Sequence, residues 1–314
     1  MELTPQKILE EYKNNNLDKN SAIELLISLV ENSDDDEVRI DSIKNLKKID
    51  ATPENIFKLC ENLMISDSNE KIRNTAAKLI RVYFLDKALK PMKWALLHES
   101  DYNCLINIIK TLVDIRNEES KEILINEIKN IRKKKYLDKN KRIDNKKFRR
   151  SIKKLLKERN YDSFSHEELA QIIINFKTMV VLTKKFYSAY FDLKNALVYK
   201  LDLADVEYEV RGWKSDFKNN IRDISEIIGL KNLTHLKSLN LSNNLIRNVK
   251  ELKEMENLTH LYISNNKISD IENVSYIKNI PNLVYLDISG NKFVEKINKL
   301  DFKNIELKLK KMHY

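Results

Sequence analysis

The chain has little glycine, proline or cysteine. Its 314 residues include 3 glycines, 4 prolines and 2 cysteines, whereas average usage would give roughly 22 glycines and 16 prolines. So few glycines exclude glycine-rich phosphate-binding loops and disfavour a turn-dense β-sandwich. Two cysteines cannot make a disulfide framework, so we expect a reducing compartment and interpret Cys60 and Cys104 as small buried side chains.

Membrane-spanning runs and catalytic signatures are also missing. The longest apolar stretches, such as 179–182, fall far short of the ~18 residues that cross a bilayer. The first residues show no basic-then-apolar signal pattern, and we therefore expect a cytoplasmic protein without a transmembrane segment. No phosphate-binding loop, nucleophile elbow, zinc-protease motif or C-x-x-C pair occurs, and the five histidines have no metal-ligand spacing. We expect no enzyme activity, cofactor or metal; a site assembled only by the fold is the alternative.

Positive charge is concentrated in one segment. The formal net charge is +10, and residues 132–159 alone hold 15 basic residues and 3 acidic ones. Such a segment attracts nucleic-acid phosphates or anionic lipid headgroups, while a solvated loop or a docking site for an acidic protein is the alternative. The expected anion-binding residues are Arg132, Lys133, Lys134, Lys135, Lys141, Arg142, Lys146, Lys147, Arg149 and Arg150.

The N-terminal half repeats an amphipathic helical pattern. The pair Val38–Arg39 returns 34 residues later as Ile72–Arg73, and weaker copies begin near Cys104 and Phe148. Each copy follows a further amphipathic stretch, at 22–30, 56–64, 92–97 and 123–131. A two-helix unit of 32 to 34 residues is a solenoid period, and the arginine pairs resemble HEAT repeats. The resemblance implies a right-handed α-solenoid of helix pairs over residues 1–160. Because Leu105 replaces the arginine in the third copy, a generic helical bundle is the alternative.

Capping signals and spacing refine this half. Thr4–Pro5 predicts a helix start, and Asp67-x-x-Glu70 and Ser165-x-x-Glu168 predict capping boxes. The fourth copy follows the third after 44 residues, so we expect an inserted basic loop at about 132–147. Residues 161–185 are expected to form connecting helices.

The C-terminal half changes to another repeat. The segment 236–246 (LKSLNLSNNLI) returns 22 residues later at 258–268 (LTHLYISNNKI) and 25 residues after that at 283–293 (LVYLDISGNKF). Each copy fits L-x-x-L-x-L-x-x-N-x-[IF], and the three copies resemble leucine-rich repeats. The short 22-residue class, found in phosphatase-1 regulatory subunits, implies a short solenoid with a parallel β-sheet on its concave face. The repeated asparagines, Asn244, Asn266 and Asn291, are then structural, because their amides satisfy backbone groups at the turns.

The ends of this array are less regular. Two strands around a tight turn are expected at 187–203, followed by an insertion at 205–216, and the tail 297–314 is expected to cap the open sheet edge. The leucine-rich half thus covers 186–314, with an N-terminal hairpin and a C-terminal cap. The two halves together predict a mixed α and β repeat protein, which resembles modular HEAT and leucine-rich repeat proteins of archaea.

The predicted functional face follows from the strands. Residues that alternate with the buried leucines point to the concave face, and the expected protein-binding residues there are Lys200, Asp202, Asn240, His260, Tyr262, Tyr285 and Asp287. We expect both tyrosines to be exposed, where they would offer contact area and a hydrogen bond to a protein partner. The sequence therefore predicts a non-enzymatic interaction scaffold. Polar residues that merely solvate the sheet, and nucleic-acid or anionic-membrane binding through 132–159, are the alternatives.

Overall fold

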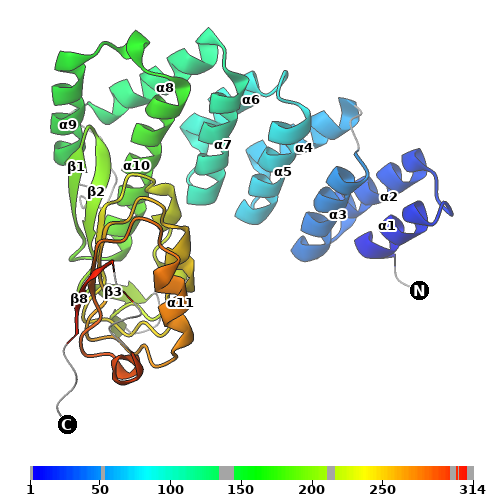
Figure 1. Cartoon of the computed structure of the whole chain (residues 1–314). Coiled ribbons are helices and arrows are strands. Elements are labelled where there is room, and N and C mark those ends of the chain that lie inside the picture. The colour runs from blue at the N-terminus through cyan, green and yellow to red at the C-terminus, as the bar shows by residue number, and fades with distance from the viewer. Residues whose placement is uncertain are drawn as a thin grey trace. The chain divides into compact units, whose positions relative to one another are not determined.

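The computed structural model describes residues 3–50, 54–133, 145–210, 216–297, 302 and 304–309 (Figure 1). Packing divides the chain into two compact units, Met1–Asn126 and Glu127–Tyr314. Among the described residues, no helix combines the length and the apolar character that a membrane span needs. The boundaries expected at residues 160 and 185 stay predictions, which a fragment experiment can test.

The first unit is built from amphipathic helices whose apolar stripes face one another. Helix α2 packs against α3, α4 against α5 and α6 against α7, and α3, α5 and α7 also contact one another in series (Figure 1). The bounds are α1 (Pro5–Lys13), α2 (Lys19–Asn32), α3 (Asp36–Lys48), α4 (Glu54–Ser66), α5 (Glu70–Tyr83), α6 (Leu89–His98) and α7 (Tyr102–Ile115), and α8 (Glu118–Ile131) crosses into the second unit. The N-terminal half is therefore helical, as the sequence predicts.

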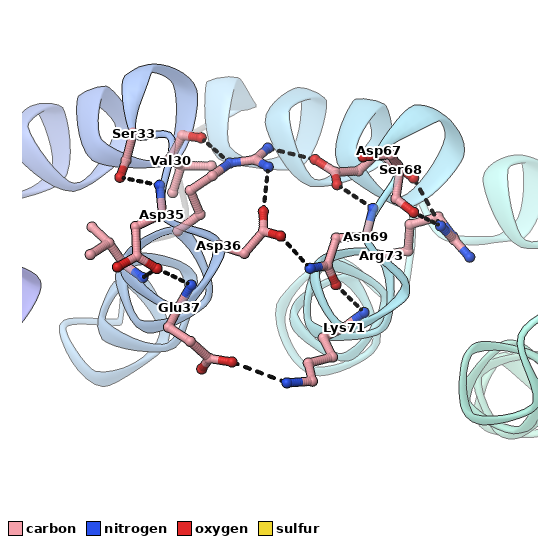
Figure 2. A network of polar contacts seen from close by, with 12 residues as sticks. Val30, Ser33, Asp35, Asp36, Glu37, Asp67, Ser68, Asn69, Lys71 and Arg73 are labelled. Atoms are coloured by element: carbon pink, nitrogen blue, oxygen red, sulfur yellow. Dashed lines mark hydrogen bonds and ion pairs between the residues drawn. The ribbon is translucent and has the colours of Figure 1, made fainter. Parts of the chain in front are cut away.

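An arginine near the start of a helix joins each of two repeats to the next one. Arg39 of α3 bonds Asp36 in its own helix at 3.3 Å and forms an ion pair with Asp67, which lies before α5. Arg73 has the same position in α5 and holds both carboxylate oxygens of Glu99, at 2.8 and 3.1 Å. Figure 2 shows the polar network around Asp36 and Asp67, which belong to successive repeats.

Equivalent positions of successive repeats also touch each other directly. Lys71 pairs with Glu37, 34 residues earlier, at 3.1 Å (Figure 2). Asn107 donates to the side-chain oxygen of Asn74, 33 residues earlier. These two contacts span 34 and 33 residues, which is the spacing read from the sequence.

The second unit combines helices with a six-stranded sheet. Its further helices are α9 (Asn145–Glu158), α10 (His166–Lys185) and α11 (Glu272–Lys278). The sheet order is β1-β2-β5-β6-β7-β8, in which β1 and β2 form an antiparallel hairpin and the other neighbours are parallel. The strands are β1 (Tyr190–Lys194), β2 (Leu197–Asp202), β5 (Ser238–Asn240), β6 (His260–Tyr262), β7 (Tyr285–Asp287) and β8 (Glu306–Lys308). A separate antiparallel pair, β3 (Glu207–Val210) and β4 (Asp216–Asn219), begins within the interval 205–216 where an insertion is predicted and extends past its end.

Helices α9 and α10 belong to this second unit through aromatic and ionic contacts. Phe148 of α9 meets Phe176 of α10 edge to face, with ring centres 5.3 Å apart, and lies 5.8 Å from Phe191 of β1. At the end of α8, Glu127 pairs with Lys177 of α10 at 2.8 Å, and both side chains are nearly buried. The strands therefore fold against helices that precede them in the chain.

The leucines of the repeat signature stack into a continuous core. Leu201, Leu239, Leu261 and Leu286 pair in register from β2 to β7, and each is 0% exposed. Since neighbouring strands lie ~4.8 Å apart, the stacked side chains exclude water along the whole array. This confirms the inward direction predicted for them.

Buried asparagines hold the turns that follow the strands. Asn266 donates from Nδ2 to the carbonyls of Leu241 and Ile263, at 2.9 and 3.0 Å, and its Oδ1 accepts from the backbone N–H of Ile246 at 3.0 Å. The same pattern recurs at Asn244 and Asn291. Each asparagine thus satisfies at least three backbone groups that the turns would leave unpaired, and the predicted structural role is confirmed.

Candidate functional site

Strand register places the predicted protein-binding residues in two columns on one face of the sheet. One column runs through Lys200, Ser238, His260, Tyr285 and Glu306. The other runs through Asp202, Asn240, Tyr262, Asp287 and Lys308. Because side chains alternate along a strand, the two columns share one side and the leucines between them take the other. We call these columns the sheet face; it brings together all seven residues predicted from the sequence.

Aromatic rings cluster where β6 and β7 meet on the sheet face. The ring centres of Tyr262 and Tyr285 are 5.0 Å apart, and those of His260 and Tyr285 are 5.9 Å apart and nearly parallel. His260 is exposed, but both tyrosines are half-buried rather than exposed as predicted, because neighbouring rings cover part of each other. Burial, and then the charge of Asp287, raise the pKa of Tyr285, so its hydroxyl stays protonated and can donate a hydrogen bond.

Several polar residues of the sheet face are held by the chain itself. Asp287 is 5% exposed; its carboxylate accepts from the backbone N–H of Ser289 at 3.1 Å and from Nζ of Lys308 at 3.0 Å. The hydrogen bond to Asp287 raises the pKa of Lys308. Asp202 accepts from Nδ2 of Asn240 at 3.2 Å. These intrachain hydrogen bonds hold polar side chains in place around the aromatic cluster. The carboxylate of Asp287 therefore has a structural role.

Besides Ser238, four residues extend the sheet face beyond the seven that the sequence predicts. Tyr190 and Asp192 join it from β1, where each pairs with a residue of β2, and Glu306 and Lys308 join it from β8. The first two follow from antiparallel pairing across a two-residue turn, a signal that the sequence contains. For β8 the only signal is an alternation of polar and apolar residues at 306–308, since the tail lacks the repeat consensus.

The predicted anion-binding residues lie in different environments. Four of them, Lys134, Lys135, Lys141 and Arg142, fall outside the described residues. Lys147 donates from Nζ to the carbonyl of Phe191 at 2.8 Å and lies 3.8 Å from the ring centre of Tyr190. Arg132 donates to the hydroxyl of Tyr161 at 2.7 Å. Lys147 and Arg132 therefore take part in the packing of the second unit.

The solvent side of α9 carries the more accessible part of this charge. Its exposed cations are Lys146, Arg150, Lys153, Lys154 and Lys157, and Arg149 is half-buried. Lys133, after the end of α8, is exposed and donates to Asn130 at 2.8 Å. The exposed cations give α9 one positively charged face.

Groups suited to covalent or metal chemistry are not assembled in the described part of the chain. No cluster of three histidine, cysteine, aspartate or glutamate side chains there has the geometry to hold a metal ion. Cys60 and Cys104 are buried free thiols. Burial raises the pKa of Cys60 to about 12 and also raises that of Cys104. Both thiols therefore stay protonated at neutral pH, as poor nucleophiles.

Comparison with known proteins agrees with the strand-bearing part of the fold. A model of the family described as leucine-rich repeats in two copies matches residues 256–302. A crystal structure of internalin C2 from Listeria monocytogenes is 28% identical over 30% of this chain and 38% of that chain, with a TM-score of 0.24. This chain thus spans well under half the length of that structure. No curated protein matches the chain. The match of the family model places leucine-rich repeats in the C-terminal part of the chain.

Proposed function

We propose that the protein is a non-enzymatic scaffold that binds a partner protein through the sheet face. The observation that carries the proposal is the aromatic cluster of His260, Tyr262 and Tyr285 on the open side of parallel strands. Aromatic side chains dominate the binding energy of protein interfaces because they bury a large area with few rotatable bonds.

The surroundings of the cluster also suit a protein partner. Tyr262 and Tyr285 restrict each other's rings, so little side-chain entropy is left to lose on binding. Charged and polar side chains of the sheet face flank the rings, and Lys200 and Asp202 lie two strands away. An apolar centre with a polar rim is the usual anatomy of a binding patch. Leucine-rich repeat domains generally bind other proteins through such surfaces.

For the helical half we propose a right-handed, HEAT-like α-solenoid that acts as a second part of the scaffold. The links from Arg39 to Asp67 and from Arg73 to Glu99 support it, since they join one repeat to the next at the same helix position. Repeats that touch only their neighbours form extended surfaces rather than a closed cavity.

Capture of partners on the immobilised full-length chain tests the sheet face. The chain is incubated with a lysate of the source cells, and bound proteins are quantified by mass spectrometry. We expect at least one protein to be captured by the wild type and lost by Tyr262→Ala with Tyr285→Ala, because interface tyrosines of this kind contribute about 2 kcal/mol or more each.

The matched control is Tyr276→Ala, which removes a tyrosine from α11, away from the sheet-face columns. It is expected to retain every captured protein. Thermal unfolding of each variant confirms that the fold is kept. The proposal is wrong if the double variant retains all partners or if the control loses the same ones.

A second candidate function is the binding of nucleic acid or of an anionic membrane by the cations of α9. The exposed cationic face of that helix favours it. Binding to an oligonucleotide or to vesicles with anionic lipid is then expected to weaken steeply as salt rises. Replacing Arg150, Lys153 and Lys154 by glutamine is expected to remove it. A response that does not change with salt would exclude this candidate.

A further inference from the structure

A basic hollow lies beside the asparagine ladder of the leucine-rich array. It has a volume of about 680 Å³ and is lined by Arg222, Asp223, Leu245, Arg247, Lys267, Ser269 and Lys292. We call it the basic hollow. Its volume falls within the range of roughly 300–1,000 Å³ that small-molecule sites occupy. None of its residues belongs to the sheet face or to the basic segment 132–159.

Four successive turns of the array contribute one cation each to this hollow. Arg222 and Arg247 directly follow buried isoleucines, and Lys267 and Lys292 directly follow the ladder asparagines. The two arginines hold one position of the repeat and the two lysines hold another, and all four side chains line the same hollow. A ligand with closely spaced negative charges would match these four cations.

The backbone that carries these cations is fixed by the asparagine ladder. The N–H of Ile221, next to the first arginine, donates to Oδ1 of Asn244 at 2.9 Å. The N–H of Ile246, next to the second arginine, donates to Asn266 at 3.0 Å, and the N–H of Lys267 donates to the carbonyl of Ile246 at 2.9 Å. The backbone that carries the exposed side chains of Arg222, Arg247 and Lys267 is therefore held in place before any ligand binds, which lowers part of the entropic cost of binding.

Positive charge exceeds negative charge among the residues that line the hollow, with four cations and one carboxylate. No carboxylate in the described part of the chain lies within 4.0 Å of a charged nitrogen of the four cations. Asp223 also lines the hollow, and its carboxylate accepts from the N–H of Ser225 at 2.8 Å. Hydrogen bonds from Ser225 lower the pKa of Asp223, so it stays ionised and offsets one of the four positive charges. The remaining charge favours an anionic ligand.

The chemistry of the lining favours phosphate. Guanidinium groups match phosphate oxygens two at a time, ammonium groups add point charges, and the hydroxyl of Ser269 can donate a hydrogen bond. Leu245 is the one apolar lining residue, and no described aromatic ring lines the hollow to stack on a base. We propose that the basic hollow binds a compact ligand with neighbouring phosphate groups, such as an inorganic polyphosphate or the phosphate chain of a nucleotide.

Calorimetric titration of the full-length chain with sodium tripolyphosphate tests the proposal. We expect saturable binding whose affinity falls as salt rises from about 50 to 200 mM. Arg247→Gln with Lys267→Gln is expected to weaken binding at least about tenfold, because two charge-assisted contacts are lost. ATP is expected to bind about as tightly as tripolyphosphate, since nothing in the hollow holds the base.

Two matched variants separate the basic hollow from general positive charge. Lys250→Gln with Lys253→Gln removes the same charge from exposed positions of the array outside the hollow, and Arg150→Gln with Lys154→Gln removes it from α9. Both are expected to bind tripolyphosphate as the wild type does. Equal weakening by either control, or unchanged binding by the hollow variant, overturns the proposal. Tighter, hollow-dependent binding of a short oligothymidylate would replace it with a nucleic-acid site.

Discussion

At the scale of single residues, Glu99 is the carboxylate on which the link between two helical repeats depends. Burial favours a raised pKa, but hydrogen bonds from Arg73 and from the backbone N–H groups of Asp101 and Ser100 outweigh it and lower the pKa below the ordinary 4.5. A carboxylate with a lowered folded-state pKa stabilises the fold above its unfolded-state pKa. That stability is lost as the pH falls through the folded-state value.

The first prediction is therefore that Glu99→Gln weakens the acid dependence of stability. At neutral pH we expect it to lower the free energy of unfolding by about 1–3 kcal/mol, because the half-buried guanidinium of Arg73 loses its ionic partner. Urea titrations between about pH 3 and pH 7 measure both effects. Glu37→Gln is the control, since its exposed pair with Lys71 contributes at most about 1 kcal/mol. If the free energy of unfolding of Glu99→Gln falls with decreasing pH as steeply as that of the wild type, Glu99 is not the source of the acid dependence.

A second residue-scale prediction concerns Gly290, where the third leucine-rich copy departs from asparagine. Its φ is +69°, and a Cβ added there would lie 2.1 Å from Oδ1 of Asn265. Gly290→Ala is expected to lower the free energy of unfolding by about 1–3 kcal/mol through backbone strain and this collision. In an Asn265→Gly background the collision is gone, so the cost of the alanine is expected to fall to about 1 kcal/mol. Chemical denaturation of the wild type, the two single variants and the double variant measures how the two substitutions interact. If Gly290→Ala lowers the free energy of unfolding equally in both backgrounds, the collision with Asn265 is excluded.

The sequence predicts the role of a residue when the same residue recurs at the same position of each repeat. It does not predict a role that depends on side chains from different repeats coming together. The ladder asparagines could be predicted because three copies keep them in register. Lys267 and Lys292 also stand in register, directly after those asparagines, yet the hollow that they share with Arg222 and Arg247 is formed by side chains from several turns. The half-burial of Tyr262 and Tyr285 likewise depends on neighbouring rings, which strand alternation alone does not describe.

At the scale of elements, helix starts show how a local signal can be overridden by a tertiary contact. Ser165 caps α10 in the predicted capping box, since its side chain accepts from the N–H of Glu168 and that glutamate bonds back. Asp67, expected to do the same for α5, instead binds Arg39, and Asn69 takes the cap position. The ion pair with Arg39 is favoured over the helix cap because the carboxylate of Asp67 is nearly buried beside the guanidinium group.

The third prediction tests the cap of α10. Ser165→Ala is expected to lower the free energy of unfolding by about 1 kcal/mol, because the N–H of Glu168 loses its acceptor. Ser165→Asp keeps an acceptor at the helix start and is expected to stay near the wild type. Thermal and urea unfolding compare the two variants. If Ser165→Ala and Ser165→Asp lose the same free energy of unfolding, the hydroxyl of Ser165 has a role other than helix capping.

At the scale of the whole molecule, the repeat period predicts which segments form repeats but not which compact unit they join. Helix α9 continues the helical pattern in the sequence, so a boundary at residue 160 is expected. In space, α9 contributes Phe148 to a cluster with Phe176 and Phe191 of the second unit. Its Ser151 also accepts from the backbone N–H of Ala196 in the hairpin turn, at 2.8 Å. Periodicity records only which face of a helix is apolar, not the partner that covers it.

The last prediction follows from this difference. A fragment of residues 118–314 keeps α8 and α9 and is expected to unfold cooperatively. A fragment of residues 161–314 loses the ring that covers Phe176 and Phe191 and leaves Lys177 without Glu127, so it is expected to unfold at a lower denaturant concentration or to aggregate. Within the longer fragment, Phe148→Ala should cost about 3–5 kcal/mol. If the two fragments unfold with the same midpoint, the boundary at residue 160 is the correct one, and α9 packs on the hairpin without stabilising it.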